Sequence, residues 1–399
     1  MNKTDLLTLN FLECSNILIG HTHAVNCLVD LNGLIWSGSS DFTIRGWEPS
    51  GKCAKTLVGH QNWVRCLQVF QNTLFSGSAD KDRTICQWDV NSEKCTMIYN
   101  EQTSLVRCLQ AFNGVLYSGS IDHCIRGWSI ETGKCTTVLT GHTNWVKCLQ
   151  IIGNTLYSGG DDRSIRAWNL SNRTCSIVFT GHTSIVICLA TNENKLYSGS
   201  RDKTIREWNI ETGTCTGIFE GHLNDVNCLC MFGSVLYSGS DDKTIRGWDT
   251  VSKTCISVLN GHTNAVNCLL SFEGALYSGS ADKTIRVWTN LSEQALEPLK
   301  AQFSKLLEER ENKSELVTNI KNEHVQELRK IKDKIKKLKE DHKIELKKLS
   351  KELRHKTKET DVIGDFVSFL ILSYFMKNMT PLLTKKTTKL KNLKTMLPH

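Results

Sequence analysis

The chain has 399 residues, of which 40% are hydrophobic and only four are proline, so it is long enough for one large domain or two smaller ones. Residues 1–290 hold 24 Lys/Arg and 25 Asp/Glu, whereas residues 291–399 hold 25 and 16, so the last quarter carries the whole net charge of +8. This asymmetry excludes a general attraction of the first 290 residues to nucleic acid or membranes.

The first segment aligns with part of a later repeat. Residues 13–21 read ECSNILIGH and match KCTTVLTGH at 134–142, although no complete repeat precedes them. The preceding run LLTLNFL is short and follows Asp5, which argues against a signal peptide.

Tryptophan then recurs with a period of about 40 residues. The copies are spaced 41 residues apart once and 40 residues apart five times, at Trp47, Trp88, Trp128, Trp168, Trp208, Trp248 and Trp288. A Gly-His pair accompanies six of them, and Glu101-Gln102 replaces it in the third. Each unit holds four short strand-like runs bounded by turn residues, such as VNCLL (266–270), LYSGS (276–280), TIRVW (284–288) and, from another copy, KCTTVL (134–139). This pattern is typical of the four-stranded blades of a β-propeller.

The Gly-His pair, the SGSxD run and the strand-ending tryptophan resemble the WD-repeat family over residues 11–290. The literal Trp-Asp occurs only at Trp88-Asp89 and Trp248-Asp249. The style VxCL…LYSGSxDxTIRxW is most similar to the propellers of TRAF-type ubiquitin ligases, zinc-finger-associated propellers and myosin heavy chain kinases. The resemblance implies an all-β fold, a seven-bladed WD-repeat β-propeller (1–291). The residue pattern that follows predicts a long α-helix or coiled coil.

The seventh repeat lacks its outer strand. Pro298 falls where Val258 lies one repeat earlier, and proline cannot donate to a sheet ladder. We therefore expect the N-terminal strand within residues 13–21 to close the propeller by supplying that strand.

The seventeen cysteines follow the repeats: seven lie on predicted outer strands and seven on inner strands, with Cys86, Cys124 and Cys230 in addition. An outer-strand cysteine and the next inner-strand cysteine lie roughly three strand spacings of ~4.8 Å apart, which is too far for a disulfide. We interpret them as buried free thiols that act as small apolar residues, which indicates a reducing compartment, the cytoplasm or the nucleus. We expect no cofactor and no metal.

The resemblance also assigns roles to the repeated polar residues. In WD repeats a Trp, a Ser, a His and an Asp form a buried hydrogen-bonded tetrad, which satisfies polar groups between packed blades. In blade 2 an insertion leaves Asp80 or Asp82 as the acid, and in blade 3 Gln102 replaces the histidine, so blade 3 is expected to be the loosest. The alternative, a Ser-His-Asp hydrolase, would require near-identical triads in most repeats. The matching sets are His21, Ser37, Asp41 and Trp47; His142, Ser158, Asp162 and Trp168; His182, Ser198, Asp202 and Trp208; His222, Ser238, Asp242 and Trp248; and His262, Ser278, Asp282 and Trp288.

Function is expected where the repeats differ. Two positions vary on one face of the predicted propeller: the third after each histidine, and the one before each turn aspartate. Apolar residues ringed by charges suit the docking of a protein or peptide, although they could instead cap the core. The candidate residues are Trp63, Leu105, Ile121, Trp145, Asp161, Ile185, Arg201, Asp225 and Asp241.

The pattern of residues 292–360 predicts a charged helix that starts near Pro298. Within it, apolar positions from Val317 to Leu353 recur at steps of three and four residues, as on one face of a helix. Self-association of residues 298–360 as a coiled coil is one interpretation, and a single solvated helix is the other. The lysine-rich face between residues 330 and 348 carries interspersed acids and no aromatics, which argues against nucleic-acid binding.

Residues 361–399 change character. Residues 366–376 form an uncharged run of 11, shorter than the ~20 residues of a spanning helix, and lysines follow it. Residues 362–394 could make weak membrane contact through the interface, or could plug the end of the coiled coil.

Together these features predict a non-catalytic protein-interaction scaffold in the cytoplasm. One hypothesis places it as a substrate receptor or adaptor in a ubiquitin-ligase assembly whose catalysis comes from a partner. The alternative is a cytoskeletal or membrane-trafficking adaptor held at a membrane by residues 361–399.

Overall fold

The structure, a computed structural model, describes residues 12–79, 83–100, 104–192, 194–290 and 293–356; within the C-terminal helix it describes the side chains of 319 and 321–352. The predicted tail at 361–399 and the blade residues Asp80, Asp82 and Gln102 lie outside these ranges. The chain divides into two units, at Leu296.

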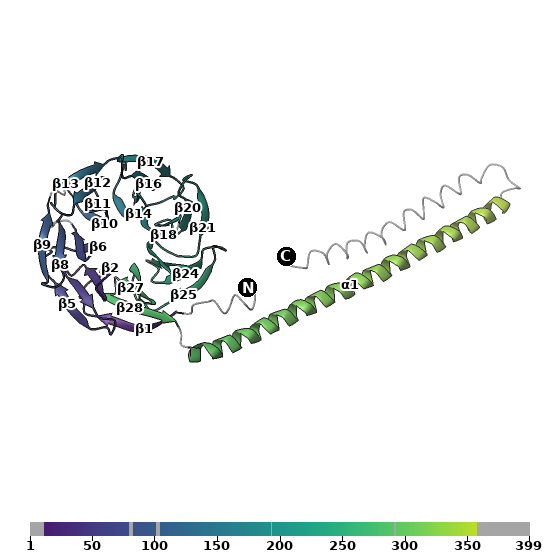
Figure 1. Ribbon diagram of the computed structural model, residues 1–399. Coiled ribbons are helices and arrows are strands. Elements are labelled where there is room, and N and C mark those ends of the chain that lie inside the picture. Colours follow the sequence, from purple (N-terminus) through teal and green to yellow (C-terminus); the bar gives the residue numbers. More distant parts are fainter. Residues whose placement is uncertain (1–11, 80–82, 101–103, 193, 291–292, 357–399) are drawn as a thin grey trace. The chain divides into compact units, whose positions relative to one another are not determined.

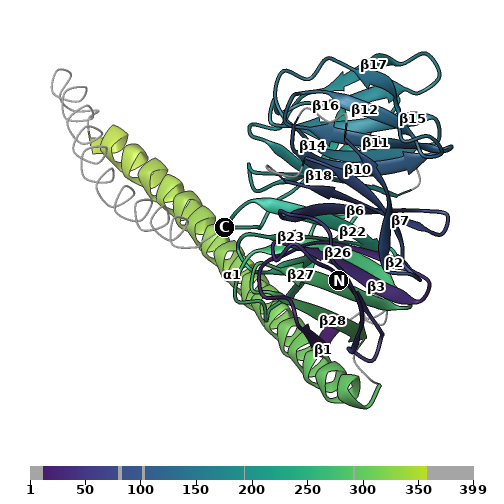
Figure 2. The same ribbon diagram turned by 90° about the vertical axis from the view of Figure 1, so that its left-hand side faces the viewer.

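The first unit contains seven four-stranded antiparallel sheets, one for each repeat, which confirms the seven-bladed propeller (Figures 1 and 2). Blades 1 and 2 are β2 (Val25–Leu31), β3 (Leu34–Ser39), β4 (Ile44–Trp47), β5 (Cys53–Leu57), then β6 (Val64–Phe70), β7 (Thr73–Ser78), β8 (Ile85–Asp89), β9 (Lys94–Tyr99). Blades 3 and 4 are β10 (Val106–Phe112), β11 (Val115–Ser120), β12 (Ile125–Ser129), β13 (Cys135–Leu139), then β14 (Val146–Ile152), β15 (Thr155–Gly160), β16 (Ile165–Asn169), β17 (Thr174–Phe179). Blades 5 and 6 are β18 (Val186–Asn192), β19 (Lys195–Ser200), β20 (Ile205–Asn209), β21 (Cys215–Phe219), then β22 (Val226–Phe232), β23 (Val235–Ser240), β24 (Ile245–Asp249), β25 (Cys255–Leu259). Blade 7 is β26 (Val266–Phe272), β27 (Ala275–Ser280), β28 (Thr284–Asn290) and β1 (Leu12–Ile19).

The N-terminal strand closes the ring, as predicted. β1 pairs with β28 from Leu12 opposite Asn290 to Ile19 opposite Thr284. The inner strand of each blade also contacts the inner strand of the next, and β26 contacts β2. β1 therefore links the first and last repeats through backbone hydrogen bonds.

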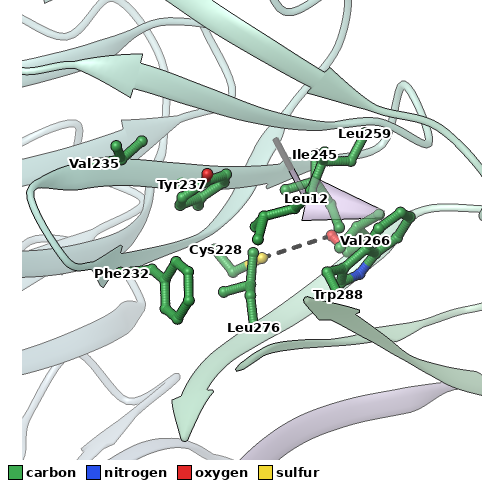
Figure 3. Close-up of a cluster of buried hydrophobic side chains, with 10 residues drawn as sticks. All are labelled: Leu12, Cys228, Phe232, Val235, Tyr237, Ile245, Leu259, Val266, Leu276 and Trp288. Atoms are coloured by element: carbon green, nitrogen blue, oxygen red, sulfur yellow. Dashed lines mark hydrogen bonds between the residues drawn. The ribbon is translucent and has the colours of Figure 1, made fainter. Parts of the chain in front are cut away.

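Apolar side chains from neighbouring blades interlock to form the core. Figure 3 shows one such cluster, in which Leu12 of β1 lies with Trp288 of blade 7 and Tyr237 of blade 6. Tyr237 and Trp288 are almost completely buried. Because each cluster draws on two adjacent blades, packing holds the blades in a ring.

A glycine in the second strand of each blade brings the next blade close. At Gly159, an added Cβ would lie 2.6 Å from Val186 Cγ1 of the next blade and 2.7 Å from Cys148 Sγ of its own. Both distances are below any tolerable contact, so the repeated SGS and SGG runs allow blade-to-blade packing.

Each inner strand contains a β-bulge at the same place. The pairing of the first two strands shifts between Val64 and Cys66 in blade 2 and between Val106 and Cys108 in blade 3, and equivalently in every blade. A bulge turns its extra residue out of the regular alternation. The seven residues concerned, called the bulge residues, are Asn26, Arg65, Arg107, Lys147, Ile187, Asn227 and Asn267.

All seventeen cysteines lie in the described ranges, and all are free. The inner-strand thiols are largely buried, but those of the outer strands are half-buried and Cys215 is exposed. The expectation of uniform burial is therefore wrong for the outer strands, because no neighbouring sheet covers a blade's outer edge.

The second unit is described by its helix. α1 (Glu293–Lys356) has 64 residues and begins five residues before Pro298. Glu and Ala in residues 293–297 favour helix, which accounts for the earlier start. Every described side chain of α1 is exposed, including those of Leu328, Ile331 and Leu338. In the described part of the chain, no helix is long and apolar enough to span a membrane.

Candidate functional site

The repeated polar residues form hydrogen-bonded tetrads between strands. In blade 4, Trp168 Nε1 donates to Ser158 Oγ at 2.8 Å, and Ser158 Oγ lies 2.7 Å from His142 Nε2. His142 Nδ1 then lies 2.7 Å from Asp162 Oδ2. The same three contacts occur in blades 1, 5, 6 and 7, in the sets ending at Trp47, Trp208, Trp248 and Trp288.

The tetrad aspartate also holds its turn. Asp162 accepts hydrogen bonds from the backbone N–H of Thr143 and of Ser164, and from the Ser164 hydroxyl. Burial alone would favour the neutral acid, but the hydrogen bonds from His142 and Ser164 outweigh it and hold the pKa of Asp162 well below its usual range. Ser158 is 0% exposed, so its hydroxyl cannot reach a substrate. The geometry supports a structural role for these groups.

In blades 2 and 3 the structure describes part of the same network. His60 Nε2 lies 2.6 Å from Ser76 Oγ, and Trp88 donates to the same hydroxyl at 2.7 Å. In blade 3, Trp128 donates to Ser118 at 2.8 Å. Because the candidates Asp80, Asp82 and Gln102 are outside the described ranges, the expectation that blade 3 is the loosest stays a prediction.

The two variable positions of each blade lie side by side. In each blade, the residue just before the turn aspartate donates its backbone N–H to the backbone carbonyl of the other variable residue. In blade 4, for example, Asp161 N donates to Trp145 O at 2.9 Å. These hydrogen bonds bring the candidate residues together in pairs across neighbouring loops. The seven pairs are Ala24 with Ser40, Trp63 with Ala79, Leu105 with Ile121, Trp145 with Asp161, Ile185 with Arg201, Asp225 with Asp241, and Ala265 with Ala281.

Four of the five apolar candidates line one hollow on blades 2 to 4. This aromatic hollow, of about 440 Å³, is lined by Trp63, Arg65, Ala79, Leu105, Val106, Arg107, Ile121 and Trp145. Trp63 is 41% exposed, whereas Leu105, Ile121 and Trp145 are half-buried and Ala79 is buried. These residues therefore both cover the core and present an apolar surface.

A second hollow lies at the centre of the ring. This channel mouth, of about 360 Å³, is lined by all seven bulge residues together with Ile185, Arg201 and Asp225. Arg65 and Arg107 line both hollows, so the two are adjacent.

The bulge residues were not among the sequence candidates. The position between Val and Cys in each inner strand reads Asn, Arg, Arg, Lys, Ile, Asn and Asn along the chain. It varies almost as much as the two predicted positions, so the same reasoning applied to it would have found Arg65, Arg107 and Lys147.

The charged candidates form short ion pairs. Lys147 Nζ lies 3.4 Å from Asp161 Oδ1, and Arg201 Nε lies 3.2 Å from Asp225 Oδ2. Burial raises the pKa of Asp225 and the nearby Asp241 adds to this effect, against the opposing effect of Arg201. Asp241 accepts a hydrogen bond of 2.6 Å from Asn227 Nδ2. Asp225 and Asp241 thus place the acidic side of the face on blade 6, with Arg201 of blade 5 beside it.

Within the described residues, no group of three His, Cys, Asp or Glu side chains could hold a metal ion. Burial raises the pKa of the Cys66 and Cys148 thiols to about 12, so neither is an activated nucleophile.

The comparisons with known proteins agree with this geometry. The sequence model described as "WD domain, G-beta repeat" matches residues 12–48, 51–89, 133–169, 173–209, 213–249 and 253–289, more than half of the chain. The ranges omit residues 90–132, which include most of the third repeat. The comparison with curated proteins gave no match. The solved structure "Crystal structure of WD40 beta propeller domain of Doa1" resembles this chain with a TM-score of 0.64 and 21% identity, over 72% of this chain and 99% of that one, which shows a shared fold. The chain belongs to the WD domain, G-beta repeat family.

Proposed function

We propose that this protein is a non-catalytic interaction scaffold that docks a peptide segment of a partner over the aromatic hollow. WD40 propellers typically bind protein partners, and this fold supports that general role. The specific proposal rests on one observation: two tryptophans, Trp63 and Trp145, line a hollow together with four aliphatic residues and two arginines. Trp and Arg are the residues most enriched at binding hot spots.

The exposure of the hollow supports docking over simple core capping. A tryptophan that only covers the core gains most from complete burial, yet Trp63 keeps 41% of its surface exposed. Arg65 lies over the Trp63 ring at 4.4 Å from its centroid, which restrains the orientation of the ring. A restrained, exposed aromatic ring loses little conformational entropy on binding.

The helix α1 supplies the second part of the proposal, self-association. Leu328, Ile331, Ile335 and Leu338 are 42 to 57% exposed and fall at helical spacings of three and four. Pairing of two chains along this face would remove the apolar surface from water and raise the avidity for repeated partners.

A double variant tests docking. Peptides selected by display against the full-length chain would be measured by fluorescence polarisation with wild type and with Trp63→Ala/Trp145→Ala. We expect the double variant to bind at least about tenfold more weakly, because it removes the two hot-spot side chains.

The matched control is Leu223→Ala. Leu223 is an exposed apolar residue of blade 6 (75% exposed) and lines neither hollow. The Leu223→Ala variant should bind the peptides like wild type. Equal losses of peptide affinity in the two variants, or no loss in the double variant, would contradict docking at the aromatic hollow.

Within this role, we propose substrate reception in a ubiquitin-ligase assembly, on the basis of the repeat style. Proximity labelling in cells would compare wild type with the Trp63→Ala/Trp145→Ala variant. Ligase subunits are expected among the proteins that wild type labels and the variant does not. Coat or cytoskeletal proteins in their place would favour the trafficking adaptor.

A further inference from the structure

Three cations gather at one side of the channel mouth. The bulge residues of blades 2, 3 and 4 are Arg65, Arg107 and Lys147, whereas those of blades 1, 6 and 7 are asparagines. All seven positions have the same bulged backbone, so the residue type decides what each contributes.

The asparagines tie adjacent blades together. Asn26 Nδ2 donates to Val64 O at 2.8 Å, and Asn267 Nδ2 donates to Val25 O at 2.9 Å. Asn227 makes the equivalent bond to the next inner strand at 3.2 Å. A neutral amide is therefore sufficient for blade packing at this position, so packing does not require the three cations.

The cations are close enough to repel one another. Burial lowers the pKa of Lys147, and the neighbouring Arg107 lowers it further, while Asp161 opposes both. Arg107 Nε is buried and has no hydrogen-bond partner among the described residues. Gathering like charges in a partly buried mouth costs free energy, which an anion bound there would offset.

The same cations lie against the aromatic rings. Arg107 lies 5.8 Å from the centroid of the Trp145 ring, and Lys147 Nζ lies 4.7 Å from it on the inner strand of the same blade. An anion at Arg107 would thus lie beside an apolar surface, so the two hollows can be filled by neighbouring side chains of one extended peptide.

We propose that the face takes an acidic peptide segment: an Asp or Glu carboxylate enters the channel mouth at Arg107 and Lys147, and a nearby apolar side chain fills the aromatic hollow. This inference rests on the docking proposed above and adds the chemistry of the docked segment. The acidic side at Asp225 and Asp241 sets its direction, because like charges repel the carboxylate from blade 6.

Four pools of capped fluorescent nonapeptides would test this. Each pool has a fixed central Leu and, two residues on, Glu, Gln, Lys or phosphoserine, with Gly, Ala, Ser and Thr randomised elsewhere. Fluorescence polarisation with the full-length chain is expected to show the Glu pool binding about tenfold or more tightly than the Gln pool. In Arg107→Gln that preference should fall below about twofold.

Two further variants separate local from general effects. Lys283→Gln changes the net charge equally at an exposed turn of blade 7 that lines neither hollow, and it should keep the preference. Arg107→Lys keeps a cation at the site and should restore most of it, which also controls for a folding defect in Arg107→Gln.

The outcomes distinguish this inference from docking itself. Equal binding of the Glu and Gln pools, an unchanged preference in Arg107→Gln, or retention of only the phosphoserine pool would overturn the carboxylate site. If the pools bind without charge preference but lose binding in Trp63→Ala/Trp145→Ala, docking stands and this inference falls. If no pool binds, this inference falls, and docking is decided by the display-selected peptides.

Discussion

The serine hydroxyl at the centre of each tetrad links two strands and, through the histidine, two loops. In blade 4 it accepts from Trp168 and pairs with His142, which in turn pairs with Asp162. Because Ser158 and His142 are buried, removing one partner leaves another polar group unsatisfied. A cost of about 1–3 kcal/mol per lost partner is therefore expected.

The pKa of Asp162 gives this network a pH dependence. Its folded-state pKa lies well below the unfolded value near 3.9, so its contribution to stability is complete above about pH 4 and is lost as the pH falls below that value. We expect Asp162→Asn to lower the free energy of unfolding at pH 7, and the gap to wild type to narrow at pH 3.

Urea unfolding followed by circular dichroism at both pH values measures this gap. The aspartates of blades 1, 5, 6 and 7 have lowered pKa values for the same reason, so wild type itself should also weaken in acid. A gap as large at pH 3 as at pH 7 would show that the Asp162 carboxylate does not contribute through its charge.

At the scale of elements, the contribution of the N-terminal strand β1 to stability can be tested directly. Leu18 is 2% exposed and packs in a cluster with Trp47 and Ile285, whereas its neighbour Ile19 is 76% exposed. Leu18→Ala should cost about 2–5 kcal/mol, as for other buried leucines. Ile19→Ala should stay within about 0.5 kcal/mol.

Denaturant unfolding of the two variants side by side checks this difference. Because β-branched isoleucine favours strands more than leucine does, β propensity alone would make Ile19→Ala the costlier change. Similar losses would mean that β1 holds blade 7 through its backbone pairing and not through the buried leucine.

The strands and their closure could be predicted from the sequence because they depend on periodicity. Seven tryptophans in register, and a fourth-strand pattern at 13–21 with none after Trp288, are enough to place β1 beside β28. The bulges could not be read in this way, because a bulge depends on how two strands pair. Arg65, Arg107 and Lys147 were missed for that reason, whereas the loop positions that include Trp63 and Trp145 were found.

At the scale of the whole molecule, the proposed self-association through α1 can be tested directly. We expect wild type to sediment as a dimer or a higher oligomer in analytical ultracentrifugation, and Ile335→Gln/Leu338→Gln to shift it toward the monomer. The physical reason is that glutamine removes the apolar contacts of two exposed seam positions.

The control is Lys336→Gln/Lys337→Gln, which introduces the same residue at exposed positions off the seam. It should sediment like wild type. A monomeric wild type would leave α1 as a single solvated helix, the other interpretation of its pattern.

The closure of blade 7 by β1 also sets the order of events during synthesis. Arg286 and Cys14, which contact each other in that blade, are 272 residues apart. At ~5–20 residues per second, a ribosome needs roughly 14 to 54 seconds to make the partner of a strand that has already emerged. The earlier blades can form in turn during this interval, while β1 waits unpaired with its aliphatic residues in water. The newborn chain thus has a built-in delay, in which a chaperone has its main opportunity to act.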